Sequence, residues 1–323
     1  MTLVLTGAIP LACDMNLTPR DSYPPQWRFI SSAVAVDRQC RAEANWRFLV
    51  CQRNHYTEKV MPAKAPAWFD IVRFDLTLGT EQVLKSSKDG GEPSVAADGR
   101  VLYRKGGELI LTGPHGAPLD RIAMDAEFQV FLLPVINPDS TLIALTGLRR
   151  GSPASEPSGT EQPMDLFLLD IKSRSLRQMG KEGCPTGMIT DMAWQDRRTL
   201  LISTREHSKH KVFWDRTVAL TTDGNRCSLV FFNDARGDRW TINAPSRLAA
   251  SVTSQTNGPQ VTVSNFSGEQ YYAIEGGSKN LACLPDVILL HNDGRRMLLA
   301  CRHGTRESYN PVMVTWRTSN EHK

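Results

Sequence analysis

The stretch Asn137-Pro-Asp-Ser-Thr-Leu-Ile-Ala-Leu145 joins a tight turn directly to an apolar run. Pro138-Asp139 starts a type I turn, because proline presets the φ angle of one turn residue and aspartate bonds to nearby backbone N–H groups. Leu142–Thr146 then supplies apolar and β-branched residues over the length of one strand. The stretch therefore predicts one half of a β-hairpin, and the same order of turn and strand recurs along the chain.

The recurrence sets the architecture. Turn signals that precede apolar runs are anchored near Asn45, Asp98, Asp139, Asp196, Ser246 and Asp293. They lie about 40–60 residues apart, which is the length of one four-stranded unit. No stretch keeps the 3.6-residue period of a long helix. We predict an all-β fold, a six-bladed β-propeller of four-stranded antiparallel blades, with seven blades as the alternative.

Several segments resemble a known repeat. Asn137–Leu145 is similar to the Ser-Pro-Asp-Gly-Lys-hydrophobic box of TolB-like β-propeller repeats. Asp165–Asp170, followed by Ser173–Met179, resembles the second half of that repeat, and Phe69–Leu84 resembles a second copy. The resemblance extends over residues 30–317. It implies the propeller fold and a role in binding other proteins, but it does not carry over the TolB partner.

The amino terminus has a different composition. Leu3–Ala12 is a short apolar stretch that ends at Cys13 and resembles the end of a bacterial lipoprotein signal. This implies lipidation of Cys13 and a periplasmic or outer-membrane location in a Gram-negative bacterium. No basic residue precedes the stretch and Pro10 lies where leucine is usual, so a frayed segment of a cytoplasmic protein is the alternative. A start codon assigned too late would account for the missing basic residues.

Residues 1–26 are predicted to be the remnant of this anchor with a proline-rich linker, residues 27–317 the propeller and residues 318–323 a tail. The last blade lacks an obvious fourth strand, and the proline-rich segment before Trp27 is a poor candidate to supply it. The seven tryptophans, roughly one for each blade, are expected to pack in the core between blades.

Besides Cys13 there are six cysteines, an even number that suits pairing. Cys40 and Cys51 bracket one turn signal symmetrically, and Cys283 and Cys301 bracket another. Directly opposed strand residues have Cβ atoms about 4.5–5.5 Å apart, close to disulfide range. We therefore predict both pairs as disulfides where the first and last blades meet. The partners of the remaining cysteines, Cys184 and Cys227, stay open. Disulfides favour an oxidising compartment, and buried thiols are the alternative.

In each blade, the connections between the second and third strands emerge at one face, which we call the long-loop rim. We place these connections at residues 52–68, 148–164, 204–212 and 302–311. Long loops on a rigid scaffold concentrate binding residues. The candidate partner-binding residues are His55, Tyr56, Arg149, Arg150, His207, Lys209, His210, Lys211, His303, Arg306 and Tyr309. Tyrosine, arginine and a basic surface suit an acidic or polar protein partner.

These patterns predict a non-enzymatic protein-binding module, a monomer that acts as a scaffold or as a toxin-immunity protein. The net charge of +4 is too dilute for a nucleic-acid surface. No cofactor or metal is expected, because phosphate-binding glycine motifs are missing and the pair His207 and His210 lacks a third ligand. Asp191 and Asp286 are the only acids that we place near inner strands. The alternative is a propeller enzyme of the lyase, lactonase or glycosidase type, with its site at the central channel.

Overall fold

The computed structural model describes residues 28–29, 40–42, 48–55, 68–75, 78, 80–88, 91–151, 164–179, 184, 188–207, 213–223, 226–233, 239–243, 246–255, 258–267, 269–274, 285–290, 295–302 and 309–315. The regular elements of these residues are all strands. No described segment is a helix long and apolar enough to cross a membrane.

The strands assemble into six four-stranded sheets. The first three are blade 1 with β2 (Cys40–Ala42), β3 (Phe48–His55), β4 (Trp68–Asp75) and β5 (Thr80–Ser87); blade 2 with β6 (Gly91–Val95), β7 (Val101–Lys105), β8 (Glu108–Thr112) and β9 (Pro118–Ala123); and blade 3 with β10 (Phe128–Ile136), β11 (Leu142–Arg149), β12 (Asp165–Asp170) and β13 (Leu176–Met179).

The other three are blade 4 with β14 (Met188–Trp194), β15 (Thr199–His207), β16 (Phe213–Thr221) and β17 (Cys227–Asn233); blade 5 with β18 (Arg239–Asn243), β19 (Leu248–Gln255), β20 (Gly258–Asn265) and β21 (Gln270–Ile274); and blade 6 with β22 (Pro285–Leu290), β23 (Arg296–Arg302), β24 (Tyr309–Thr315) and β1 (Arg28–Phe29).

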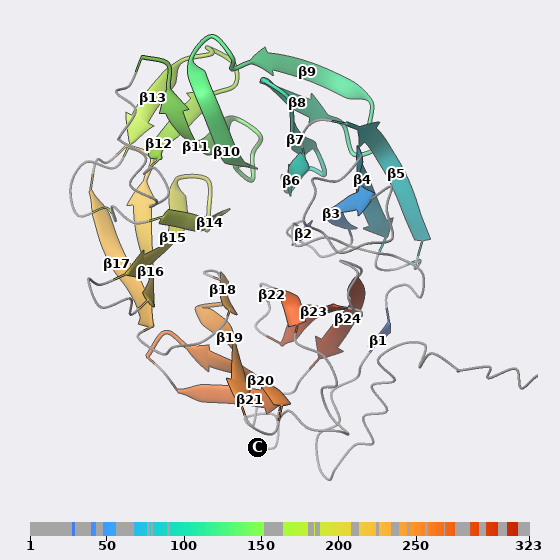
Figure 1. The fold of residues 1–323 in the computed structure, drawn as a ribbon, viewed down its shortest axis with the longest axis vertical. Coiled ribbons are helices and arrows are strands. Elements are labelled where there is room, and N and C mark those ends of the chain that lie inside the picture. Colours follow the sequence, from blue (N-terminus) through green and yellow to red (C-terminus); the bar gives the residue numbers. More distant parts are fainter. Residues whose placement is uncertain are drawn as a thin grey trace, which may run out of the picture.

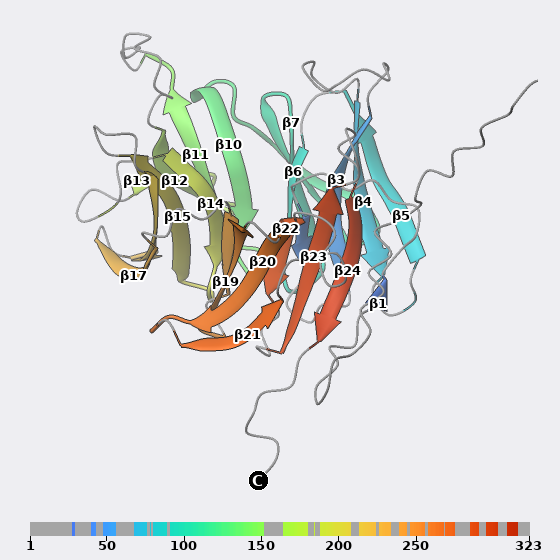
Figure 2. The ribbon, with the colours of Figure 1, turned by 60° about the horizontal axis from the view of Figure 1, so that its bottom comes forward.

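The sheets surround a central axis, with the first strand of each sheet nearest the centre (Figure 1). Every strand pairs antiparallel to its neighbour, and Figure 2 shows the strands running from one face of the ring to the other. The predicted turn anchors all fall between the first and second strands of a sheet. The prediction of an all-β propeller with four-stranded antiparallel blades is confirmed.

The ring closes through a strand from the other end of the chain. Arg28 and Phe29 of β1 pair with Met313 and Val312 of β24, so β1 becomes the outer strand of blade 6 (Figure 1). The proline-rich segment before Trp27 was judged a poor candidate for this role. The closing strand instead begins directly after Trp27, where no proline interrupts the ladder.

The core lies between neighbouring blades rather than inside one sheet. Leu102 and Leu109 of blade 2 pack with Phe128, Ile143 and Phe167 of blade 3 in one buried cluster. The rings of Phe128 and Phe167 meet edge to face, with centroids 4.8 Å apart. Because each sheet is covered on both faces, its middle strands read as continuous apolar runs instead of alternating ones.

The turn at Asn137 links three blades. The buried Asn137 side chain accepts hydrogen bonds from the N–H groups of Thr141 and Leu142 at 2.8 and 2.9 Å, and its Nδ2 donates to the carbonyl of Arg197 in blade 4. Ser140 has a positive φ of 59° at the position where the resembled box has glycine. Its hydroxyl donates to the Asp98 carboxylate of blade 2 at 3.0 Å, which helps to hold this strained conformation.

Replacing Asn137 by alanine is expected to lower the free energy of unfolding by about 1–2 kcal/mol, because two N–H groups of the turn lose their acceptor and the Arg197 carbonyl loses a donor. Urea unfolding followed by tryptophan fluorescence measures this change. Asp139→Ala removes an exposed side chain from the same turn and serves as the control, with an expected change within about 0.5 kcal/mol. Equal losses in the two variants would contradict the bracing role of Asn137.

Two disulfides are present in the described residues. Cys40 and Cys51 are direct partners across β2 and β3 with Cα atoms 4.1 Å apart, which confirms the symmetric prediction. The second disulfide joins Cys184, on the connection from blade 3 to blade 4, to Cys227 at the start of β17, with Cα atoms 4.8 Å apart. The sequence offered no symmetry for this pair, because its two cysteines belong to no common hairpin.

The predicted opposition of Cys283 and Cys301 is wrong in register. Cys301 lies opposite Pro285, because the ladder of β22 and β23 pairs Leu290 with Met297, so the hairpin is centred later in the chain than the midpoint of Cys283 and Cys301. A count of residues from an expected turn gives the wrong register when the turn itself is centred elsewhere. Cys283 itself lies outside the described residues, so its disulfide stays a prediction.

Candidate functional site

The inner strands carry irregularities where they line the central channel. The pairing register shifts in β6 between Gly91 and Ser94, in β10 between Leu132 and Val135, and in β14 between Ile189 and Asp191. A bulge leaves one residue outside the ladder and redirects its side chain. The bulge of blade 2 carries Glu92 and the bulge of blade 4 lies next to Asp191, on inner strands whose unpaired edges already provide N–H and C=O groups.

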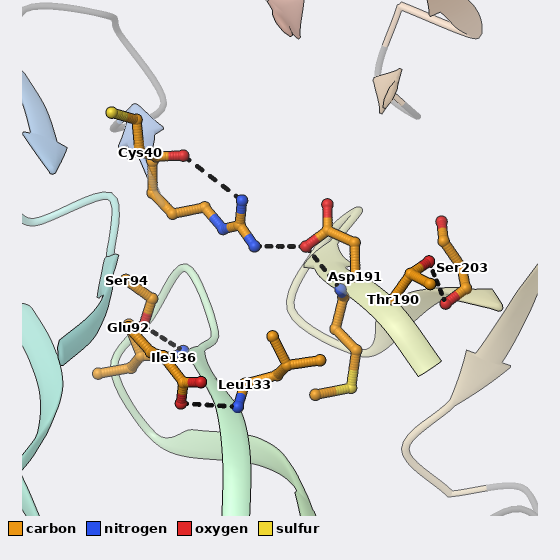
Figure 3. A network of polar contacts seen from close by, with 10 residues as sticks. Cys40, Glu92, Ser94, Leu133, Ile136, Thr190, Asp191 and Ser203 are labelled. Atoms are coloured by element: carbon orange, nitrogen blue, oxygen red, sulfur yellow. Dashed lines mark hydrogen bonds and ion pairs between the residues drawn. The ribbon is translucent and has the colours of Figure 1, made fainter. Parts of the chain in front are cut away.

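Glu92 is the acid at the bulge of β6. Its backbone has a positive φ of 55°, and its N–H donates to Oε1 of Gln52 at 2.9 Å. Its Oε2 accepts a hydrogen bond from the N–H of Leu133 at 3.0 Å and lies 3.4 Å from Nε of Arg104. Burial raises the pKa of the Glu92 carboxyl group above its ordinary value, although Arg104 opposes this. Glu92 thus caps the inner edge of β10 from the neighbouring blade (Figure 3).

The neighbouring Gly91 is required at this bend. A Cβ atom at this position would lie 1.7 Å from Oε1 of Gln52, and the φ angle of 143° disfavours any larger residue. The channel wall is fixed further along β10 as well. Ile136 donates its N–H to Ser94 Oγ at 3.2 Å, and Trp194 of β14 donates from Nε1 to the carbonyl of Val135 at 3.1 Å.

An ion pair crosses the channel. Arg41 on β2 of blade 1 donates from one guanidinium nitrogen to Oδ1 of Asp191 on β14 of blade 4, and from the other to the Cys40 carbonyl at 3.4 Å (Figure 3). The side chains of Arg41 and Asp191 remain 29% and 41% exposed. Asp191 also accepts the N–H of Met192 at 2.9 Å. Glu92 and Asp191 are thus both bonded by partners from the protein itself.

A second polar group lies on the long-loop rim, at the ends of β3 and β4. His55 and Trp68 are direct register partners, and their rings stack with centroids 4.7 Å apart and an interplanar angle of 12°. His55 Nε2 lies 2.7 Å from Oδ2 of the buried Asp70, and Ser86 Oγ donates to Oδ1 of the same carboxylate at 2.7 Å. We call His55, Trp68, Asp70 and Ser86 the rim platform.

In the rim platform, a hydrogen bond holds the imidazole of His55 in place, and the indole of Trp68 is exposed. Because a carboxylate only accepts hydrogen bonds, Nε2 of His55 donates to Asp70, and Nδ1 is the remaining acceptor of the neutral ring. Trp68 is 39% exposed, although its neighbours hold it in place. This combination suits recognition of a polar or aromatic group of a partner, because the aromatic and imidazole rings are already ordered.

Blade 3 provides a basic part of the same rim. Arg149 ends β11, and its guanidinium lies 5.2 Å from the centre of the Phe167 ring. Arg150 donates from Nε to the carbonyl of Asp125, and Val130 beside this group is 41% exposed. In blade 2, which lies between blades 1 and 3, the corresponding connection is the two-residue turn Gly106-Gly107 that joins β7 to β8.

The structure places the predicted partner-binding residues unequally. His55 and Arg149 end strands, and Arg150 follows directly, all on the long-loop rim. His207 and Tyr309 lie in β15 and β24 rather than in loops as predicted, because these strands extend further than their apolar runs suggest. The other candidates lie outside the described residues: Cys13, Tyr56, Lys209, His210, Lys211, His303 and Arg306.

The predictions from the sequence missed several functional candidates. Glu92 was missed because no apolar run marks the start of β6, which begins at Gly91. Asp70 and Ser86 have no signal of their own, since only the register of β3, β4 and β5 brings them to His55. Trp68 was expected in the core, but it lies at the rim. In the described part of the chain, no three metal-ligating side chains cluster.

Comparison with known proteins gives the fold and no more. No family model matches the chain, and no curated protein matches it. A solved oligogalacturonate lyase in complex with manganese is 12% identical over 92% of this chain and 96% of its own, with a TM-score of 0.55. The β-propeller domain of the Trilobed protease from Pyrococcus furiosus is 8% identical over 88% and 81%, with a TM-score of 0.52. TolB from Acinetobacter baumannii is 14% identical over 78% and 60%, with a TM-score of 0.45.

Proposed function

We propose that this chain is a non-enzymatic binding module that holds a partner protein on the long-loop rim. The observation that carries the proposal is the rim platform, in which the exposed Trp68 stacks on a histidine fixed by the buried Asp70. Large aromatic side chains with few rotatable bonds provide much of the energy in protein interfaces. Because these rings are ordered before binding, little conformational entropy is lost when a partner arrives.

The charge of the rim suggests what the partner presents. Arg149 and Arg150 are exposed, and a guanidinium binds carboxylates through a planar pair of donors. Asp125 and Glu127 lie on the same rim, so it offers both signs of charge. We propose a partner that sets acidic side chains opposite the two arginines and an apolar or aromatic side chain against Trp68.

The acids of the central channel also favour a binding module over the enzyme alternative. Glu92 is committed to Leu133 and Arg104, and Asp191 to Arg41. Catalysis by paired carboxylates requires one group that donates a proton and one that is available as a base or nucleophile. Because both carboxylates are bonded to groups of the protein, they hold the blades together rather than face a substrate. This favours a binding role for the protein.

The proposed setting is the cell envelope, with the protein exported and anchored by a lipid on Cys13 as a monomer. The two disulfides suit an oxidising compartment. A scaffold and a toxin-immunity protein both fit such a module. Mass spectrometry of the amino-terminal peptide, from protein made in its source cells with the native upstream sequence, tests the anchor: a diacylglyceryl mass on Cys13 supports it, and an unmodified Met1 contradicts it.

Two matched arginine pairs test the binding face. The Arg149→Glu, Arg150→Glu double variant reverses the charge on the long-loop rim. The Arg197→Glu, Arg198→Glu variant makes the same change on the opposite face, in the turn between β14 and β15. In quantitative affinity purification from source cells, the rim variant is expected to recover about tenfold less partner and the control as much as the wild type. Melting temperatures near the wild-type value confirm that both fold. The reverse ranking would move the interface to the other face.

A further inference from the structure

The ion pair between Arg41 and Asp191 joins opposite sides of the ring. Arg41 belongs to blade 1 and Asp191 to blade 4, with 150 residues between them. The other ion pairs of the described side chains join residues of one blade or of adjacent blades, as between Arg174 and Asp120. The contact of Arg41 with Asp191 therefore occupies the channel itself and does more than fasten one blade to the next.

Separating Arg41 from Asp191 requires little free energy. Both side chains are partly exposed, and ion pairs in contact with solvent add little to the stability of a protein. If the pair separates, Asp191 keeps its hydrogen bond from the N–H of Met192 and gains water. Arg41 keeps its bond to the Cys40 carbonyl. A ligand that takes the place of Asp191 therefore displaces an interaction that contributes little to the stability of the protein.

The guanidinium is already arranged for a carboxylate. It offers five N–H donors in a planar fork, and the bonds to Cys40 and Asp191 come from its two terminal nitrogens. Figure 3 shows the Asp191 carboxylate as the acceptor of the hydrogen bond that one of these nitrogens donates. The side chain of Asp191 thus marks both the position and the chemistry of a ligand that Arg41 can bind.

The neighbouring acid does not close this site to an anion. Glu92 lies at the bulge of β6, near enough to Arg41 for the guanidinium charge to oppose the rise of the Glu92 pKa that burial causes. Its own oxygen is bonded by the N–H of Leu133 and lies near the Arg104 guanidinium, which offsets its charge locally. A second carboxylate approaching Arg41 therefore meets less repulsion from Glu92 than it would from an isolated acid.

We propose that the central channel contains a carboxylate-binding site, with Arg41 as its anchor and Asp191 as an internal occupant that a ligand displaces. The carboxylate belongs either to a small organic acid or to the end of a polypeptide that reaches into the channel. This site is separate from the rim platform and does not depend on the proposed interface.

Removing the internal competitor gives the sharpest test. Isothermal titration calorimetry at low ionic strength would use succinate, a Gly-Gly-Ala tripeptide with a free carboxyl terminus, and its amidated twin. Asp191→Asn is expected to bind a carboxylate probe about tenfold more tightly than the wild type, whereas Arg41→Gln is expected to lose binding. Asp165→Asn, which removes an exposed carboxylate from β12 outside the channel, is the control and should match the wild type.

Each outcome bears on the proposal. Preference for succinate assigns the site to small acids, and preference for the free over the amidated peptide assigns it to a chain terminus. Should Arg41→Gln fail to fold by circular dichroism, Arg41→Lys keeps the charge without the fork and is expected to bind about tenfold more weakly. Absence of binding in folded Asp191→Asn, or equal binding by Asp191→Asn and Asp165→Asn, would overturn the proposal.

Discussion

Removing the disulfide between Cys184 and Cys227 by a double alanine substitution is expected to lower the free energy of unfolding by about 2–4 kcal/mol. The bridge ties the connection that leaves blade 3 to the outer strand of blade 4, and it closes a chain segment with a sequence separation of 43. Cys227 is also buried and packs in the cluster with Val135 and Met192, so its loss leaves a gap between the blades.

The other disulfide supplies the comparison. Cys40 and Cys51 close a segment with a separation of only 11 and join two strands that already pair. Because the entropy removed from the unfolded chain grows with the length of the closed loop, the Cys40→Ala, Cys51→Ala variant is expected to lose about 1 kcal/mol less. Chemical unfolding with and without dithiothreitol measures both effects. If the reductant leaves wild-type stability unchanged, the disulfides do not form, and the oxidising compartment is wrong as well.

Trp68→Ala is expected to weaken partner binding by about 30-fold or more, mainly through faster dissociation. The substitution removes an exposed indole and leaves His55 without its stacking neighbour. Trp68→Phe keeps an aromatic face and is expected to recover most of the affinity. Surface plasmon resonance against the partner captured by affinity purification separates the association and dissociation rates.

A matched control excludes a general loss of apolar surface. Leu119 is 56% exposed on β9, next to the turn from β8 at the face opposite the long-loop rim. Leu119→Ala should leave the dissociation rate within about twofold of the wild type, since a surface residue away from an interface contributes little. A loss in Leu119→Ala equal to that in Trp68→Ala would mean that the partner does not distinguish the two faces.

Local sequence patterns predict this fold well because its units are local. Each hairpin combines a turn signal with an apolar run, so Asp98, Asp139 and Asp196 could be placed between first and second strands without knowledge of the rest of the chain. The pair of Cys40 and Cys51 was predictable for the same reason, because symmetry about one turn determines which residues face each other.

What the sequence could not give depends on register and on contacts between blades. The bulge that redirects Glu92 adds one residue to a strand without any composition signal, and Cys301 misses its expected partner because the turn between β22 and β23 is centred later than predicted. Arg41 and Asp191 meet only because the ring closes, and closure depends on two residues after Trp27 that form too short a strand to be recognised. The rim platform likewise needs three strands in register.

The most direct test of the proposed interface is photo-crosslinking in the source cells. A benzoylphenylalanine residue would replace Trp68 on the long-loop rim in one variant and Arg197 on the opposite face in another. The rim variant is predicted to form a covalent adduct with one partner protein on irradiation, and the Arg197 variant is predicted to form none. An adduct from the Arg197 position alone, or no adduct from the Trp68 position, would contradict binding through the long-loop rim.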